Sequence, residues 1–111
     1  MMNKIVRHGL IGILKEDKIE EYEKLHQKVW PEILLLIKDC HLNNYSIFRE
    51  GTMVFSYYEY DGDNYEADMK KMEDNSRNKE WWSHTCPCFE QFRVRQDTEY
   101  DVEMKEIFYL K

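Results

Sequence analysis

The sequence has few of the residues that build disulfide frameworks or phosphate-binding loops. Its three cysteines are an odd number, and Cys86-Pro87-Cys88 does not have the C-x-x-C spacing of a redox pair, so we expect reduced thiols and no disulfide framework. Its four glycines are scattered, which leaves no glycine-rich phosphate cradle, and no G-x-S-x-G motif occurs. Nucleotide cofactors and hydrolase triads are therefore disfavoured.

Long hydrophobic runs are also missing. No stretch approaches the ~20 apolar residues of a membrane span, and the run from Leu10 to Leu14 is interrupted by Gly12 and too short for a signal peptide. Sixteen basic against 22 acidic residues give a net charge of -6, which repels phosphate backbones and anionic lipid surfaces. We therefore expect a cytoplasmic protein that binds neither nucleic acid nor membranes.

The chain is rich in residues that build a core. It has 111 residues, among them three tryptophans, eight tyrosines and five phenylalanines, enough for one hydrophobic core without a metal or disulfide staple. A charged fraction of 34% indicates a well-solvated outer surface. We expect a single domain over residues 1–111.

The first half of the chain predicts a strand followed by a long helix. Residues 5–14 are mostly apolar and end at the polar Lys15, as a strand does before a turn. Asp17 with Glu20 resembles a capping box, and apolar residues then recur every three or four positions as far as Cys40. Pro31 lies inside this pattern and should kink or restart the helix.

The second half predicts a hairpin, two helices and a final strand. The expected elements are strands 45–49 and 52–60 around Glu50-Gly51, a weak helix through Tyr65 and Met72, a helix capped by Asn75 or Ser76 that ends at Cys86-Pro87, and a strand over 106–109. Residues 90–105 are charged and hard to assign. The order strand, helix, strand, strand, helix, strand predicts a ferredoxin-like α+β fold, an antiparallel sheet with helices on one face. The bare face needs a cover, and a homodimer is the simplest one.

His26 is the first candidate for chemistry. A spacing of four places Tyr22, His26 and Trp30 in one stripe on the helix. A lone histidine on an apolar face is more often a buried residue satisfied by a neighbour, but here the stripe presents polar tips on aromatic bodies. Such a surface suits a polyhydroxylated ligand.

Two other aromatic positions are candidates for binding. Adjacent residues on a helix point about 100° apart, so Trp81 and Trp82 cannot both face the core fully, and one of them needs a groove or a ligand. Both could equally be packing at the rim of the core, and Tyr45 has the same ambiguity. His84, Cys86 and Cys88 could ligate a metal, but a zinc site generally needs four ligands and no second cluster exists, so we expect no metal.

Several blocks of the sequence together resemble the L-rhamnose mutarotase family. They occur in order and span nearly the whole chain: Glu21-Tyr22, His26, Val29-Trp30-Pro31-Glu32, Asn44-Tyr45-Ser46-Ile47-Phe48, Trp81-Trp82 and Glu106-Ile107-Phe108-Tyr109-Leu110. The joint pattern is specific, although each block alone is weak. From Cys86 to Val102 the chain departs from the proline- and asparagine-rich loop of the family, and this difference concerns the identity of the sugar more than the reaction.

The resemblance implies a dimeric α+β barrel and interconversion of the α and β anomers of a 6-deoxy-L-hexose such as L-rhamnose, without metal or organic cofactor. It implies that His26 is the catalytic proton donor and that Tyr22, Tyr45, Trp81 and Trp82 contact the sugar. An imidazole with a pKa near 6.5 can give and take a proton near neutrality. Two alternatives share the architecture: a haem-degrading or cofactor-free monooxygenase of the dimeric α+β barrel type, and a non-catalytic sugar-binding module.

Overall fold

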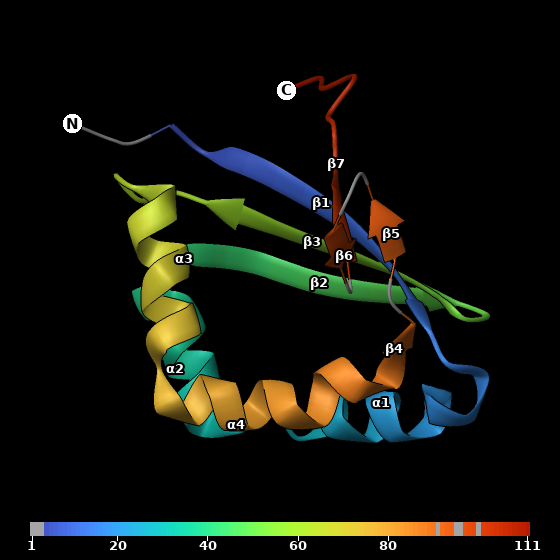
Figure 1. Cartoon of the computed structure of the whole chain (residues 1–111). Coiled ribbons are helices and arrows are strands. Elements are labelled where there is room, and N and C mark those ends of the chain that lie inside the picture. The colour runs from blue at the N-terminus through green and yellow to red at the C-terminus, as the bar shows by residue number, and fades with distance from the viewer. Residues whose placement is uncertain (1–3, 91, 95–96, 100) are drawn as a thin grey trace.

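The computed structural model describes residues 4–90, 92–94, 97–99 and 101–111, and its elements follow the expected order (Figure 1). The strands and helices of the first half are β1 (Val6–Leu14), the 3-10 turn η1 (Glu16–Lys18), α1 (Ile19–Gln27), α2 (Pro31–Asp39), β2 (Leu42–Glu50) and β3 (Met53–Tyr60). Those of the second half are α3 (Tyr65–Asp74), α4 (Ser76–Thr85), the 3-10 turn η2 (Cys86–Cys88), β4 (Phe89–Glu90), β5 (Phe92–Val94), β6 (Asp97–Glu99) and β7 (Asp101–Met104).

The main sheet confirms the predicted α+β fold. Its strand order is β2-β3-β1-β4 with every pairing antiparallel, which is the ferredoxin-like arrangement. β3 occupies one edge of β1 along its length, and the other edge is shared by β4 and β7. In Figure 1 helices α1, α2 and α4 lie below the sheet, and the C-terminal tail leaves above it. β5 and β6 form a separate two-stranded sheet.

Strands β1, β2 and β3 place alternate side chains on the two faces of the sheet. Leu14, Val54 and Tyr58 are buried toward the helices, whereas Met53 and Phe48 are exposed on the other face. The hairpin turn contains Gly51 with a φ of +59°, a conformation that glycine adopts without strain. β2 begins three residues earlier than expected, and its pairing with β3 shifts register between Asn43 and Ser46.

Pro31 divides the expected long helix into two. α1 ends at Gln27, and α2 restarts with Pro31 at its first turn, where the missing N–H has no helical partner to lose. The residue before a proline avoids the helical region, and Trp30 is accordingly extended with φ -61° and ψ 137°. The expected stripe is therefore wrong for Trp30, which lies outside α1. The capping expectation is also wrong, because Asp17 lies in η1 and no side chain caps α1.

Each helix of the second half begins after an asparagine whose side chain caps it. The side chain of Asn64 accepts a hydrogen bond from the N–H of Ala67 at the start of α3, and Asn75 accepts from Asn78 at the start of α4. α4 ends at Thr85, directly before Cys86-Pro87, as predicted. Within the described part of the chain, no helix is long and apolar enough to cross a membrane.

The expected last strand over residues 106–109 is wrong. Residues 105–111 have no regular structure. The strand at this end of the chain is β7, which ends at Met104, five residues before the end of the expected strand at Tyr109. Alternation is a local pattern, but a strand also needs an edge with which to pair. β7 pairs with β1 from Gly9 to Gly12, and after Met104 the chain leaves the sheet (Figure 1), with the carboxylate of Glu106 accepting hydrogen bonds from Arg7 of β1.

Two clusters of buried residues hold the layers together. The first joins α2, β2, β3 and α3 through Leu36, Cys40, Leu42, Tyr58, Tyr60 and Met72. The second joins β1, α1, β3 and η2 through Leu14, Tyr22, Val54 and Cys88. Residues of both clusters face the space between sheet and helices.

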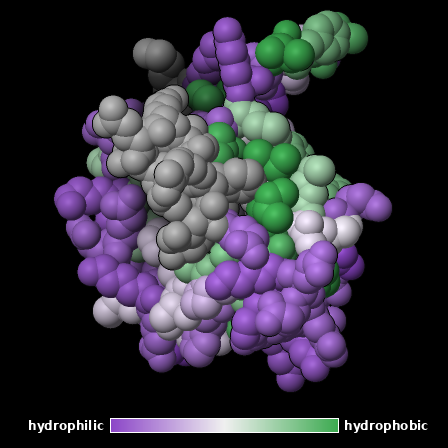
Figure 2. All heavy atoms as spheres, turned by 45° about the vertical axis from the view of Figure 1, so that its right-hand side comes forward, coloured by the Kyte–Doolittle hydropathy of each residue, from purple (hydrophilic) through white to green (hydrophobic). Residues whose placement is uncertain are grey.

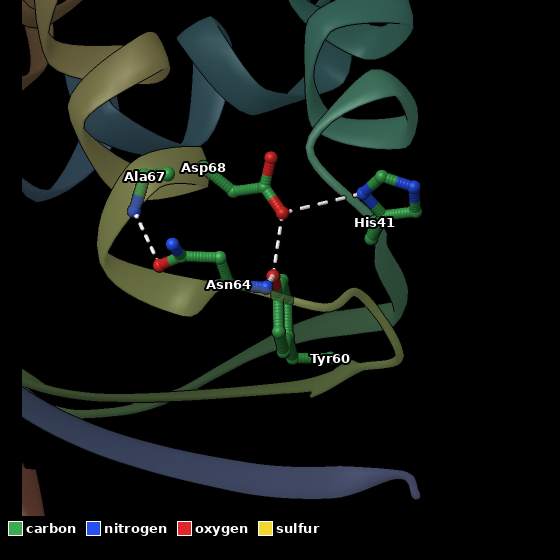
Figure 3. Close-up of polar contacts among 5 residues, drawn as sticks. All are labelled: His41, Tyr60, Asn64, Ala67 and Asp68. Carbon is green, nitrogen blue, oxygen red and sulfur yellow. Dashed lines mark hydrogen bonds and ion pairs between the residues drawn. The ribbon is translucent and has the colours of Figure 1, made fainter. Parts of the chain in front are cut away.

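A hydrogen-bond network around Tyr60 ties the end of β3 to α3 (Figure 3). The hydroxyl of Tyr60 donates to Oδ2 of Asp68 at 2.5 Å and accepts from the backbone N–H of Asn64 at 3.0 Å. Nδ1 of His41 lies 3.3 Å from the same carboxylate oxygen. Tyr60 is only 4% exposed, so its hydroxyl has little access to water and finds its hydrogen-bond partners within the protein.

We expect Tyr60→Phe to lower the free energy of unfolding by about 1–3 kcal/mol, because it removes the two hydrogen bonds of a buried hydroxyl, each of which contributes about 0.5–1.5 kcal/mol. Urea unfolding followed by circular dichroism measures the change. Tyr57→Phe is the matched control, because it removes a hydroxyl from the same strand whose partner, Glu59, can hydrogen-bond to water instead. An equal loss in both variants would contradict a special role for the Tyr60 network.

Candidate active site

A cleft of about 580 Å³ lies between the helix-facing side of the sheet and the helices. Its walls come from β1, α1, β2, β3, α3, α4, η2, β4 and β7, so most of the fold contributes to it. Most of the lining is apolar or aromatic: Leu10, Gly12, Tyr22, Leu42, Tyr45, Ile47, Val54, Tyr58, Met69, Met72, Trp81, Trp82 and Phe89. The remaining lining residues are His26, Ser56, Glu73, Thr85, Cys86 and Asp101. An apolar cleft with a few polar groups is typical of small-molecule sites.

All five residues that the sequence singled out line this cleft. Tyr22 and His26 come from α1, Tyr45 from β2, and Trp81 and Trp82 from α4. They are up to 60 residues apart in sequence, and the fold brings them together. Their roles in binding and catalysis stay predictions.

His26 is held by the backbone of its own helix. Its Nδ1 lies 2.9 Å from the carbonyl oxygen of Tyr22, one turn earlier. A carbonyl oxygen can only accept, so Nδ1 carries the proton, and in the neutral ring Nε2 is the proton acceptor. Burial lowers the pKa of His26, and the hydrogen bond to Tyr22 opposes this shift only in part. His26 is therefore neutral at pH 7, with Nε2 as a base.

Aromatic rings surround the imidazole on two sides. The ring centroids of Tyr22 and His26 are 4.3 Å apart, and the ring of Trp81 meets His26 edge-on at 5.7 Å. Trp30 lies 5.1 Å from Trp81, also edge-on, and Arg77 lies 3.8 Å above the Trp30 ring. Trp30 thus supports the cleft from behind Trp81 although it is not part of the α1 stripe.

The two tryptophans of α4 behave as their spacing predicts. Trp81 is buried at 6% exposure, while Trp82 is 37% exposed. Both line the cleft, so one indole is fixed by the core and the other remains open to a ligand.

The tyrosines of the cleft are protonated hydrogen-bond donors at neutral pH. Burial raises the pKa of Tyr22 above its ordinary range and raises that of Tyr45 to about 12. The Tyr45 residue as a whole is 42% exposed, but its hydroxyl is shielded from water. The Tyr45 ring lies 5.2 Å from that of Tyr58, whose hydroxyl shares a hydrogen bond with Tyr65.

Sequence reasoning missed several polar residues of the cleft. Ser56 and Tyr58 share a face of β3, and the alternation of that strand could have identified them. Asp101 lies in the charged segment that could not be assigned, and no local pattern marked it. Thr85 and Glu73 lie on α4 and α3, where their place in the cleft depends on how the helices pack.

The residues considered for a metal are not brought together. Cys88 is buried, Cys86 lines the cleft, and His84 is exposed with its ring 5.7 Å from that of Trp30. Within the residues that the structure describes, no group of three or more histidine, cysteine, aspartate or glutamate side chains is arranged to hold a metal ion, and Cys40, Cys86 and Cys88 are free thiols.

Comparison with known proteins identifies relatives along almost the whole chain. The model of a family described as L-rhamnose mutarotase matches residues 7–110. An L-rhamnose mutarotase from Oceanobacillus iheyensis is 31% identical over 106 residues, which cover 94% of this chain and 97% of the relative.

Solved structures with the same fold come from more than one kind of protein. An L-rhamnose mutarotase from Formosa agariphila has a TM-score of 0.73 at 23% identity, covering 96% of this chain and 99% of that one. A putative antibiotic biosynthesis monooxygenase from Nitrosomonas europaea has a TM-score of 0.60 at 11% identity, covering 97% and 95%. At these identities the likeness concerns the fold alone.

The burial of His26 predicts a pH-dependent loss of stability. Its pKa in the folded protein lies below the value of about 6.5 in an unfolded chain, so the unfolded state binds more protons once the pH falls below about 6.5. The free energy of unfolding should then drop by at most about 1.4 kcal/mol for each unit of pKa lowering, since part of the ring still meets solvent.

Urea unfolding between pH 7.5 and pH 5 tests this expectation. The free energy of unfolding should fall more steeply in the wild type than in His26→Gln, which has no titrating group at this position. His84→Gln is the control, because it removes an exposed imidazole that lies outside the cleft. Parallel curves for wild type and His26→Gln would show that the ring titrates as it does in the unfolded chain.

Proposed function

The chain belongs to the L-rhamnose mutarotase family, and we propose that its aromatic cleft is where the α and β anomers of L-rhamnose interconvert. The chain is accordingly an isomerase with the activity that the family model names. One observation carries the assignment of the site. His26 is a neutral histidine whose Nδ1 is committed to a backbone carbonyl and whose Nε2 is left for chemistry, inside a cleft lined by aromatic rings.

The proposed reaction moves one proton between two oxygens of the sugar. Nε2 of neutral His26 takes the proton from the anomeric hydroxyl O1. The electron pair of that O–H bond forms the C1=O1 double bond as the C1–O5 bond breaks, and the electrons of C1–O5 remain on the ring oxygen O5. The proton on Nε2 then passes to O5, which completes the open-chain aldehyde.

One imidazole can serve both oxygens because O1 and O5 are bonded to the same carbon. After rotation about the C1–C2 bond, the same steps in reverse close the ring with the opposite configuration at C1. His26 is thus a base first and the proton donor second. No metal or organic cofactor enters these steps. General acid–base catalysis of this kind accelerates a reaction by ~10²- to 10⁴-fold.

The other residues of the cleft hold the sugar. The hydroxyls of Tyr22 and Tyr45 are protonated and can donate hydrogen bonds to sugar oxygens. Trp82 and Trp81 offer ring faces and edges to the C–H groups and the methyl group of a 6-deoxy sugar, a contact driven by the burial of apolar surface. These binding roles match the positions at which the family resemblance expects contacts with the sugar.

The proposal for His26 is tested by substitution and exchange spectroscopy. His26→Ala should reduce the rate of anomer exchange by about 10²- to 10⁴-fold, while L-rhamnose binding measured by NMR titration falls much less. Tyr22→Phe should reduce the rate less, because it removes one hydroxyl and keeps both the ring and the carbonyl that holds His26. The two changes should combine less than additively if they serve one step.

His84→Ala is the control for this experiment, since it removes an exposed imidazole outside the cleft and should leave the exchange rate unchanged. A folded His26→Ala protein that exchanges anomers at the wild-type rate would remove His26 from the mechanism.

We also propose that the protein is a homodimer in which the bare face of the sheet is covered by a second copy. The support is the apolar character of this face, where Phe48, Met53 and Met104 are 61%, 46% and 40% exposed. The tail beside it is more exposed still, with Ile107 at 90% and Phe108 at 80%. Figure 2 shows hydrophobic residues on the projecting top of the molecule, on the side where the tail leaves the sheet. Contiguous exposed apolar surface of this kind is typical of interfaces.

Light scattering coupled to size-exclusion chromatography should give the mass of a dimer for the wild type. Phe48→Asp should shift the protein toward a monomer, because it buries a charge in the proposed interface. Leu35→Asp is the matched control, since Leu35 is 67% exposed on α2 and should not affect assembly. A monomeric wild type at micromolar concentration would refute the dimer.

A further inference from the structure

Asp101 is the acidic residue that the sheet, rather than the helices, brings to the cleft. It is the first residue of β7 and pairs with Gly12 of β1, and both positions line the cleft. Gly12 has no side chain, so nothing at the paired position separates Asp101 from the interior of the cleft. His26 and the tryptophans line the opposite wall, because they come from α1 and α4.

The position of Asp101 is fixed by the strand that carries it. β7 pairs with β1 in a continuous register from Gly9↔Met104 to Gly12↔Asp101. Two residues after Asp101, on the same face, the carboxylate of Glu103 hydrogen-bonds to Nδ1 of His8. The His8 ring is itself stacked on Tyr65 at 4.5 Å and on Tyr58 at 5.0 Å. Backbone pairing and this side-chain contact together hold the start of β7 against the sheet.

Asp101 lines the cleft from the sheet side together with Tyr45 and Tyr58, whereas His26 lines it from α1. Burial is the main cause of the raised pKa of Tyr22, Tyr45 and Tyr65, and the negative charge of Asp101 adds to it. The pKa of His26, in contrast, responds to burial and to the carbonyl of Tyr22. The cleft thus has a proton-transfer group on the helix wall and a carboxylate on the sheet wall, in addition to the carboxylate of Glu73 on α3.

A pyranose needs such an acceptor. Its hydroxyl groups are hydrogen-bond donors as well as acceptors. The indole N–H groups of this cleft can only donate, and a neutral tyrosine hydroxyl is a weaker acceptor than a carboxylate. A carboxylate has two oxygens that can accept from two adjacent hydroxyls, and hydrogen bonds to a charged acceptor are stronger than those between neutral groups.

We propose that Asp101 is a specificity-determining residue that accepts hydrogen bonds from the 3- and 4-hydroxyl groups of the L-rhamnose ring. The assignment follows from the positions of His26 and Asp101 on opposite walls of the cleft. When C1 and O5 lie against His26, the far edge of the ring, which carries the 3- and 4-hydroxyls, turns toward β7. The inference rests on the proposed function, and it places the choice of sugar in the segment where the chain departs from the family pattern.

The test compares sugars and variants by NMR titration and exchange spectroscopy. Asp101→Asn keeps the size of the side chain and should weaken L-rhamnose binding about 10- to 100-fold, the effect of losing hydrogen bonds to a charged acceptor. The exchange rate at saturating sugar should change only several-fold, because the reacting atoms lie at His26. Glu90→Gln is the control, since it removes an exposed charge from β4 on the same edge of β1, outside the cleft.

Deoxy sugars give a readout that a structural role of Asp101 would not change. The wild type should bind 4-deoxy-L-rhamnose much more weakly than L-rhamnose, while 2-deoxy-L-rhamnose should bind nearly as well as L-rhamnose. In Asp101→Asn the loss of affinity caused by the missing 4-hydroxyl should largely disappear, as expected if the Asp101 carboxylate and the 4-hydroxyl are in direct contact. The wild-type series tests the proposal by itself if the variant does not fold.

Two results would overturn the role of Asp101. One is equal affinity of the wild type for L-rhamnose and 4-deoxy-L-rhamnose. The other is an affinity difference between these two sugars that is as large in Asp101→Asn as in the wild type. Either result leaves the proposed function intact if the wild type accelerates anomer exchange. A wild type that does not accelerate exchange would refute the proposed function instead.

Discussion

The antiparallel pairing of β1 with its neighbours is the constraint on which the rest of the structure depends. β3 is paired with β1 from Val6 to Ile13, and β4 and β7 occupy the other edge. Because side chains alternate along a strand, this register decides which residues face the helices and which face the opposite side. A slip of one residue in β7 would turn Asp101 out of the cleft and bring Val102 into it. The same register leaves Met53 on the bare face, and the pairing of β2 with β3 places Phe48 there as well, so the cleft and the proposed dimer surface are opposite faces of one sheet.

The second constraint is the break at Pro31. Ending α1 at Gln27 places His26 in the last turn of a helix, and it lets the chain turn so that Trp30 packs on Trp81 of α4. Trp30, which is extended because Pro31 follows it, therefore connects the end of α1 to α4 through its contact with Trp81. The Trp81 ring in turn meets His26 edge-on.

Local patterns were enough to predict most of the fold. The alternation in β1, the turn at Gly51, the cap at Asn75 and the restart at Pro31 all depend on interactions within a few residues. Most of the failed expectations depend on distant partners. The residues from Ile107 to Tyr109 have the pattern of a strand, but the chain leaves the edge of β1 after Met104. The failure at Trp30 was local, because the proline that follows keeps Trp30 out of the helical region. Asp101 could not be found because its place in the cleft depends on pairing with Gly12, almost 90 positions away in sequence. The five predicted cleft residues were found through chemistry and family resemblance, and the fold then brought them together.

The hydrogen bond that orients His26 has a consequence for how this site can vary between related proteins. Its acceptor is the main-chain carbonyl at position 22, and every amino acid supplies that same atom. Replacing Tyr22 would alter the shape of the cleft without changing which imidazole nitrogen bears hydrogen. The proposed contact of residue 22 with the sugar can therefore diverge while the tautomer of His26 is inherited unchanged, since the tautomer depends on the helix rather than on any one side chain. Enzymes that orient a catalytic imidazole with an aspartate lack this independence, because a single substitution there alters both orientation and protonation at once.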